Sequence, residues 1–338
     1  MNKNNFDGVR IGLALIVVFA HISALTQEPD FKILDSIFNS DFAVKGFFAI
    51  SGFLVTKSYL TSNSKLEYLE KRFRRIYPAY LTAVLLCFFI GAYATSLSIS
   101  DFVKSPQTFK YLLSNAIFLN FLQPSLPSVF ESNPIQALNG ALWTIKVEVM
   151  LYFCVPPCIY LFTRLGSVKT AFILFLFSVA WVYFFGFIYN GNKGDEIARQ
   201  FPGQLSYFSL GSLLAVNDKL LSKIKWIALT STVVLISTDN AYAKILIDPI
   251  AYSSIAIFLS TAAYRNLNLG KYGDISYGIY LYHFPIIQLL IFLGSFKNLW
   301  VGLFLTFILT IMAAFVSWHL IEKRFLKRSS HYVIAAKS

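Results

Sequence analysis

Long uncharged stretches alternate along the chain with short charged segments. The hydrocarbon core of a bilayer is about 30 Å thick, so a helix needs about 20 apolar residues to cross it. Seven stretches contain no Asp, Glu, Lys or Arg, two more carry only two charged residues each, and one further uncharged stretch is short. This pattern predicts ten transmembrane helices, over residues 11–27, 42–60, 76–100, 141–163, 170–192, 200–217, 226–238, 249–264, 275–296 and 298–321.

Residues 111–130 are also uncharged, but three amide side chains and two prolines interrupt them. Such polar and helix-breaking residues suit an interfacial or re-entrant segment better than a span. Residues 97–140 then form the one long external loop, which could cover a site on that side of the membrane.

The amino-acid composition indicates which class of protein these predicted helices form. Of the 338 residues, 56% are hydrophobic and only 14% are charged, against about 45–50% and about 25% in an ordinary soluble domain. A soluble protein of this length would need more charge to cover its surface. The composition excludes a disordered chain, a disulfide-rich secreted scaffold and a soluble enzyme. It predicts an all-α polytopic membrane protein.

The net charge of +12 would suggest nucleic-acid binding in a soluble protein, but here it reports topology and affinity for anionic lipid. With the N-terminus inside and ten spans, twenty Lys and Arg residues fall on the cytoplasmic side, including Lys57 at the inner end of its span, seven fall outside and two others lie within spans. Cytoplasmic loops carry the excess of Lys and Arg. Both termini are therefore expected to be cytoplasmic.

Ionisable residues inside a bilayer are costly and are functional candidates by default. Arg10 and His21 lie eleven residues apart on the first predicted helix. Eleven residues make about three turns, which places both on one face about 16 Å apart along the axis. Arg10 would lie at the cytoplasmic mouth and bind an anion, and His21 would lie deeper and transfer protons near pH 7. The structural alternative has Arg10 reaching to the headgroups and His21 bonding a neighbouring carbonyl.

Three other places combine polar residues with predicted spans. The basic segment 71–75 follows the second predicted helix and could bind phosphate or simply anchor the protein. Glu148 lies within the fourth predicted helix with Tyr152 one turn later on its face. In the ninth predicted helix a polar stripe could line a substrate path or only bond between helices. The stripe consists of Ser276, Tyr280 and His283.

No His or Cys spacing resembles a metal site, and no phosphate-binding glycine loop or serine nucleophile elbow is present in the sequence. We therefore expect no metal.

The polar segments together resemble the acyltransferase-3 family of membrane acyltransferases, over nearly the whole chain and in family order. Each motif is weak alone, and six in order are specific. The matching segments are Phe6–Arg10 (F-D-G-V-R), Arg10 with His21, Gly46–Leu54 (G-F-F-A-I-S-G-F-L), Arg72–Pro78 (R-F-R-R-I-Y-P), Trp143 with Glu148, and Ser276–Pro285 (S-Y-G-I-Y-L-Y-H-F-P).

The resemblance implies an O-acyltransferase that moves an acyl group, usually acetyl, from cytoplasmic acyl-CoA to a sugar hydroxyl of a surface polysaccharide or its lipid-linked precursor. Arg10, Arg72 and Arg75 would hold the phosphates of the coenzyme, which is the acyl-donor substrate. His21 would act as general base. Glu148 would orient the imidazole or stabilise its charged form. Direct transfer and an acyl-histidine intermediate both stay open.

The resemblance also implies four residues that line the substrate path. Two of them, Tyr280 and His283, could also polarise the thioester carbonyl. The four are Trp143, Ser276, Tyr280 and His283.

The resemblance also bears on organisation. It implies one transmembrane domain over residues 1–323 with a short basic cytoplasmic tail over 324–338, in the cytoplasmic membrane of a bacterium. Many relatives carry a soluble hydrolase-like domain after the membrane domain, which this sequence does not show. The membrane domain is then expected to act alone, as a homo-oligomer, or with other polysaccharide-assembly proteins. The alternative function is a transporter or flippase for a glycan or lipid-linked sugar.

Overall fold

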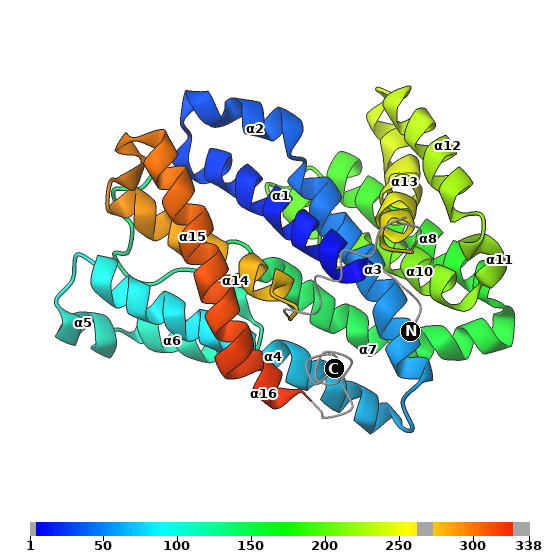
Figure 1. Ribbon diagram of the computed structural model, residues 1–338, viewed down its shortest axis with the longest axis horizontal. Helices are drawn as coiled ribbons and strands as arrows, with labels where there is room; N and C mark the ends of the chain where they lie inside the picture. Colours follow the sequence, from blue (N-terminus) through cyan, green and yellow to red (C-terminus); the bar gives the residue numbers. More distant parts are fainter. Residues whose placement is uncertain (1–4, 262–272, 327–338) are drawn as a thin grey trace. The chain divides into compact units, whose positions relative to one another are not determined.

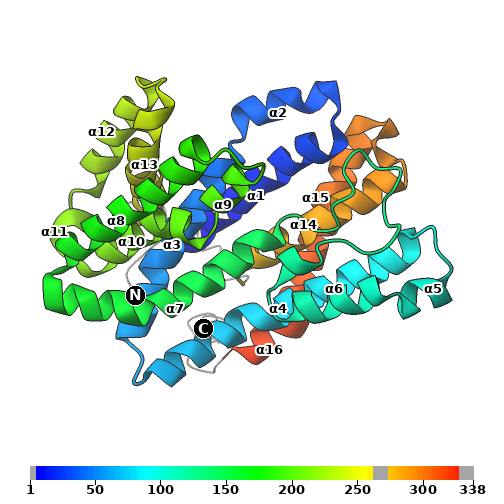
Figure 2. The ribbon, with the colours of Figure 1, turned by 180° about the vertical axis from the view of Figure 1, so that it is seen from behind.

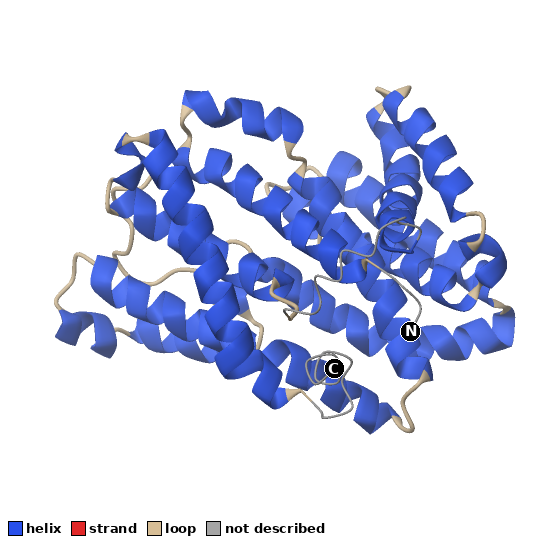
Figure 3. Ribbon diagram, viewed as in Figure 1, coloured by secondary structure: helices blue, strands red, loops and turns tan. Residues whose placement is uncertain are grey.

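A computed structural model describes residues 5–261 and 273–326, and within them the chain is almost entirely helical (Figure 3). The described residues contain no strand, only one isolated bridge between Thr95 and Val129. The longer helices are α1 (Phe6–Thr26), α3 (Ser40–Leu60), α4 (Lys65–Ala94), α7 (Leu142–Leu165), α8 (Ser167–Tyr183), α10 (Phe201–Val216), α12 (Ile224–Ile236), α13 (Ala241–Thr261), α14 (Ser276–Phe292) and α15 (Leu299–Ser317).

Short helical segments fill the connections between these helices. They are η1 (Pro29–Phe31), α2 (Lys32–Ile37), α5 (Ile99–Lys104), α6 (Pro106–Ala116), η2 (Asn120–Leu122), η3 (Phe184–Ile188), α9 (Gly194–Ala198), α11 (Asp218–Leu221), η5 (Ser295–Lys297), η6 (Trp318–Glu322) and α16 (Lys323–Phe325).

The all-helical fold predicted from the sequence is confirmed over the described residues, and each predicted span overlaps a helix there. Six helical stretches in the described part are long and apolar enough to cross a bilayer. These six are Phe6–Thr26, Lys65–Ala94, Leu142–Leu165, Ser167–Ile188, Ala241–Thr261 and Leu299–Phe325. The apolar helices α12 and α14 are shorter than a full span, so the count of ten spans stays a prediction.

One predicted boundary is wrong. The basic segment 71–75 does not lie in a connection before a helix, because α4 already begins at Lys65 and contains Pro78. Lys, Arg and Glu are good helix formers, so charge ended the apolar run without ending the helix. Segment 111–130, by contrast, is not a single helix: α6 ends at Ala116 and irregular backbone follows.

The described chain divides into two compact units. Of the described residues, the first unit comprises 5–10, 41–70 and 147–261, and the second comprises 11–40, 71–146 and 273–326. The helices α3, α8, α10, α12 and α13 belong to the first unit, and α14 and α15 to the second. The predicted single domain 1–323 stays a prediction, and most of the predicted tail lies outside the described residues.

Small residues let the helices of the first unit approach closely. A Cβ atom at Gly52 of α3 would collide with the backbone carbonyl of Phe208 on α10, and one at Gly211 would collide with that of Ala49. Membrane helices associate through such close backbone packing because lipid supplies no hydrophobic drive between them. Helices α12 and α13 lie side by side (Figure 1 and Figure 2). Ser231 and Ser254 hydrogen-bond between them at 3.2 Å.

In the second unit, α14 is the buried element and α15 packs beside it (Figure 1 and Figure 2). Pro285 lacks an N–H, so the carbonyl of Leu281 one turn earlier has no partner within the helix. The side chain of Asn139 donates to that carbonyl at 3.0 Å. Gln288 of α14 donates to the carbonyls of Ile135 and Ala137 at 2.7 and 2.6 Å. The irregular segment before α7 is thereby bonded to α14.

Replacing Gly278 by alanine is expected to loosen the α14–α15 contact. A Cβ at this position would lie 2.8 Å from the Cα and 2.9 Å from the Cβ of Ala314. We expect the free energy of unfolding to fall by about 1–3 kcal/mol, which is typical of overpacking. The measurement is a lower midpoint of thermal unfolding in detergent. Gly12→Ala is the matched control, because nothing lies within 4 Å of its Cβ position. A Gly278→Ala protein that unfolds like the wild type would contradict the close contact.

Candidate active site

Helix α1 carries Arg10 and His21 with the spacing that the sequence predicted. The helix runs without interruption from Phe6 to Thr26, so the two side chains share one face. Both residues are partly buried. Arg10 belongs to the first unit and His21 to the second.

His21 meets His283 of α14 in a direct hydrogen bond. His21 Nδ1 and His283 Nε2 lie 2.7 Å apart, and the two ring planes differ by 10° with centroids 5.0 Å apart. A centroid separation this long, with the nitrogens this close, means that the rings meet edge to edge. His283 has no exposed surface, and its Nδ1 lies 3.1 Å from the backbone oxygen of Ile279. Phe284 packs edge-on against His21, with ring centroids 5.2 Å apart.

The other two residues of the predicted polar stripe have different partners. The hydroxyl of Tyr280 bonds to that of Thr144 at 2.8 Å, and the Tyr280 ring lies edge-on to His283. Thr144 follows Trp143 in the first turn of α7, which places the start of α7 beside α14. Ser276 instead donates to the carboxylate of Asp274 at 2.5 Å. Tyr280 therefore lies next to the histidine pair, and Ser276 belongs to a separate charged cluster.

That charged cluster is built around Arg75. Its guanidinium donates to Glu322 at 2.8 Å and also forms an ion pair with Asp274, and both carboxylates are buried. The rings of Tyr277 and Trp318 each lie 5.5 Å from the guanidinium carbon. We call Arg75, Asp274 and Glu322 the Arg75 cluster. Its formal charge is −1, so the carboxylates already more than balance the guanidinium.

Sequence reasoning overlooked Asp274, although its place two residues before Ser276 was a usable signal. Arg72 precedes Arg75 by three residues and is therefore its neighbour on α4. The assignment of both arginines to coenzyme phosphates stays a prediction. His319, which lies outside the Arg75 cluster, packs its ring against Phe315 at 4.2 Å between centroids.

In the first unit, Glu148 receives two hydrogen bonds on one carboxylate oxygen. The hydroxyl of Tyr152 donates to Oε1 at 2.6 Å and that of Ser51 at 3.0 Å. The i, i+4 contact with Tyr152 was predicted and is confirmed. Ser51 was overlooked as a partner, although it lies in the motif at Gly46–Leu54. Glu148 and His21 belong to different units, so the contact proposed between them stays a prediction.

Tyr152 is held through its backbone carbonyl as well as through its hydroxyl. Pro156 cannot donate to the carbonyl of Tyr152 one turn earlier, and the hydroxyl of Tyr68 donates to it at 2.9 Å.

The two lysines within predicted spans have local partners. Lys45 pairs with Asp41, lies 3.9 Å from Asp248 and faces the ring of Tyr207. Lys146 lies over the ring of Phe121, 4.8 Å from its centroid.

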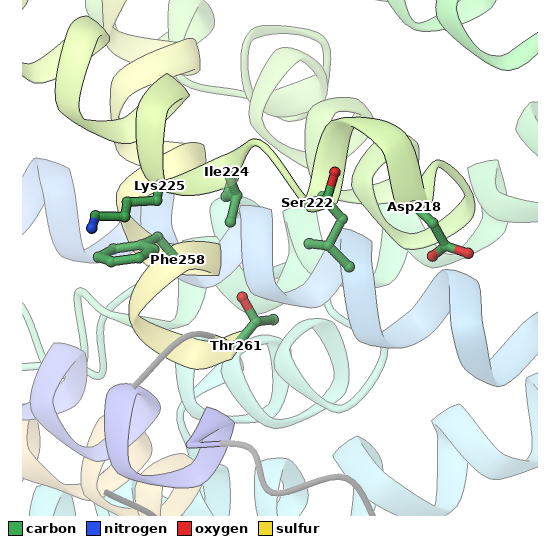
Figure 4. A pocket seen from close by; sticks show the side chains of 7 residues that line it. Asp218, Ser222, Ile224, Lys225, Phe258 and Thr261 are labelled. Carbon is green, nitrogen blue, oxygen red and sulfur yellow. The ribbon is translucent and has the colours of Figure 1, made fainter. Parts of the chain in front are cut away.

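A cavity of about 480 Å³ opens in the first unit at the ends of α11, α12 and α13 (Figure 4). None of the predicted catalytic or coenzyme-binding residues lines it. Its lining residues are Asp218, Leu221, Ser222, Ile224, Lys225, Phe258 and Thr261. Within the described residues no group of His, Cys, Asp or Glu is arranged to hold a metal ion, and the absence of a metal stays an expectation.

Comparison with known proteins places these motifs in a family. Residues 3–321 match the acyltransferase-3 family, described as an acyltransferase domain. The chain is 28% identical over 347 residues to the O-acetyl transferase of Shigella phage Sf6, covering 98% of each. It is also 28% identical over 358 residues to nodulation protein 10 of Rhizobium leguminosarum bv. viciae, covering 96% of this chain and 94% of that protein. No solved structure matches. The protein belongs to the acyltransferase-3 family.

Proposed function

We propose that the protein transfers an acetyl group from cytoplasmic acetyl-CoA to a hydroxyl of a cell-surface polysaccharide or its lipid-linked precursor. Family membership and the relative named an O-acetyl transferase support O-acyl transfer. The observation that carries the proposal is the contact between His21 and His283. These two histidines stand in different family motifs, 262 residues apart, and meet in one hydrogen bond of 2.7 Å.

In the proposed reaction His21 takes the proton of the acceptor hydroxyl while that oxygen attacks the thioester carbonyl. The carbon–sulfur bond breaks, and the coenzyme thiolate leaves and receives the proton. General base catalysis of this kind contributes about 10²–10⁴-fold in rate. Glu148 would stabilise the charged form of the imidazole, because His283 already bonds the Nδ1 through which an acid would orient the ring. Tyr280 and Trp143 would line the path.

The coenzyme would bind at the cytoplasmic mouth. Guanidinium groups pair well with phosphate oxygens, and Arg10, Arg72 and Arg75 are the proposed ligands. Arg10 lies three helical turns from His21 on α1, so the pantetheine arm would follow this helix toward the base. Of these three, Arg75 also engages the two buried carboxylates of the Arg75 cluster.

This function requires a defined topology. We propose ten spans in the bacterial cytoplasmic membrane with both termini cytoplasmic, because the Lys and Arg residues then concentrate on the inner side. That orientation places Arg10 and Arg72 where cytoplasmic acetyl-CoA arrives.

The test combines the purified protein with the glycan that it modifies. We expect the protein in nanodiscs to bind acetyl-CoA and to release free coenzyme A only when acceptor glycan is added, as followed with a thiol reagent. NMR of the surface glycan from cells with and without the gene should reveal an O-acetyl group that depends on the gene. A protein that neither binds acetyl-CoA nor releases coenzyme A, but moves glycan across the membrane, would establish the transporter alternative instead.

A further inference from the structure

The backbone around His283 dictates where this ring carries its proton. His283 Nδ1 lies 3.1 Å from the carbonyl oxygen of Ile279, one turn earlier on α14. A carbonyl oxygen can only accept, so this bond requires a proton on Nδ1 of His283. The opposite neutral tautomer would place a lone pair against the carbonyl oxygen, in a site with no solvent exposure.

The proton on His283 in turn decides the proton on His21. A neutral imidazole has one N–H, so Nε2 of His283 is an acceptor. His21 Nδ1 lies 2.7 Å from it and must therefore be the donor. The edge-to-edge arrangement of the rings, whose planes differ by 10°, suits an N–H that points at a lone pair in the ring plane. A neutral His21 then carries its proton on Nδ1 and leaves Nε2 unprotonated.

A charged His283 would reverse this bond, but the site disfavours it. The ring is wholly buried, and the described contacts of both rings include no carboxylate. Burial of an unpaired charge is expensive.

We infer that His283 is a positioning residue that fixes His21 in the tautomer whose Nε2 accepts the proton of the acceptor hydroxyl. The inference rests on the proposed function, in which His21 is the general base. The Nδ1–H of His21 stays bonded to His283 throughout, and the proton taken on Nε2 passes to the sulfur of the departing coenzyme A. His283 thus does with a neutral acceptor what the acid of a Ser-His-Asp triad does with a carboxylate.

This assignment gives His283 a different role from lining the substrate path. Without its acceptor, His21 can rotate and can hold its proton on Nε2, where it cannot serve as a base. In a Ser-His-Asp triad, loss of tautomer control costs about 10⁴-fold in kcat. Substrate binding does not depend on the tautomer, so KM should change little.

The experiment uses the full-length protein in nanodiscs with ¹⁵N-labelled histidine. The nitrogen spectrum distinguishes protonated from unprotonated ring nitrogens, and the signals of His21 are assigned by their loss in His21→Ala. We expect protonated Nδ1 and bare Nε2 in the wild type. His283→Leu should lose this preference and lower kcat by about 10²–10⁴-fold. His283→Gln places an amide oxygen at similar reach and should restore both the preference and most of the rate.

His319→Leu is the matched control, since this histidine packs against Phe315 and plays no part in the proposed reaction. If kcat falls equally in His283→Leu and His283→Gln while the His21 tautomer stays unchanged in both, the inference is overturned and His283 is a structural residue. Wild-type His21 protonated on Nε2 would also overturn it, while the loss of transfer in His21→Ala would still uphold the proposed function. Transfer that persists in His21→Ala would refute His21 as the base and the inference with it.

Discussion

Replacing His21 by alanine is expected to abolish O-acetylation of the surface glycan while the protein remains in the membrane. Alanine removes the only group that we assign to accept the hydroxyl proton, and a general base contributes about 10²–10⁴-fold in rate. Alanine is a strong helix former, so α1 should persist. The measurement is the O-acetyl signal in NMR spectra of the glycan from cells that express each variant, with protein amounts compared in isolated membranes.

A second histidine variant controls for this result. His319→Ala removes an imidazole of the same size near the end of the last long helix, where the ring contacts Phe315, and acetylation should continue. If the His21→Ala protein acetylates the glycan at the wild-type level, another residue is the base. If His21→Ala protein disappears from the membrane, the purified enzyme and its release of coenzyme A must be compared instead.

Replacing Arg75 by methionine is expected to destabilise the second unit strongly. The substitution keeps an unbranched apolar stem but removes the guanidinium that pairs with Asp274 and Glu322, whose exposed side-chain fractions are 0% and 1%. Removal of one member of a buried ion pair costs about 3–5 kcal/mol, because the remaining charge is uncompensated. The unfolding midpoint in detergent should fall far below that of the wild type.

Two further variants separate the charge from the packing. Neutralising the whole cluster, as Arg75→Met with Asp274→Asn and Glu322→Gln, should restore most of the stability, since no charge is then left unpaired. Arg74→Met is the matched control on the same helix, because the guanidinium of Arg74 donates to the backbone carbonyl of Phe325 at 3.3 Å in an exposed contact. We expect it to change stability by about 0.5 kcal/mol or less.

The same variants test whether Arg75 also binds coenzyme phosphates. A Arg75→Met protein that unfolds like the wild type but binds acetyl-CoA weakly would show that phosphate binding, not the buried cluster, is its main role. The alternative result is that Arg75→Met destabilises the protein, while the triple variant is stable and binds acetyl-CoA with the wild-type affinity. That result would leave Arg10 and Arg72 as the phosphate ligands.

Features that depend on neighbours along the chain were predictable. Uncharged runs located the helices because hydrocarbon excludes charged side chains. The face shared by Arg10 and His21, and the bond between Tyr152 and Glu148, follow from helical spacing alone. The start of α4 was not predictable from hydropathy. The residues from Lys65 onward are rich in Lys, Arg and Glu, which form helix well but give no apolar signal.

The sequence by itself determined the class of protein, most of the helices and the family motifs. The class follows from composition, the helices follow from hydrogen bonds over three or four residues, and the motifs are short segments of the sequence itself. Only the tertiary structure decided which polar groups meet. It joined His21 to His283 and Arg75 to Asp274 and Glu322, and it gave Glu148 the hydroxyl of Ser51 as a partner. Such contacts join residues far apart in the chain, and no local periodicity encodes them. They exist because each polar group buried among packed helices must find a partner, and packing decides which partner is within reach.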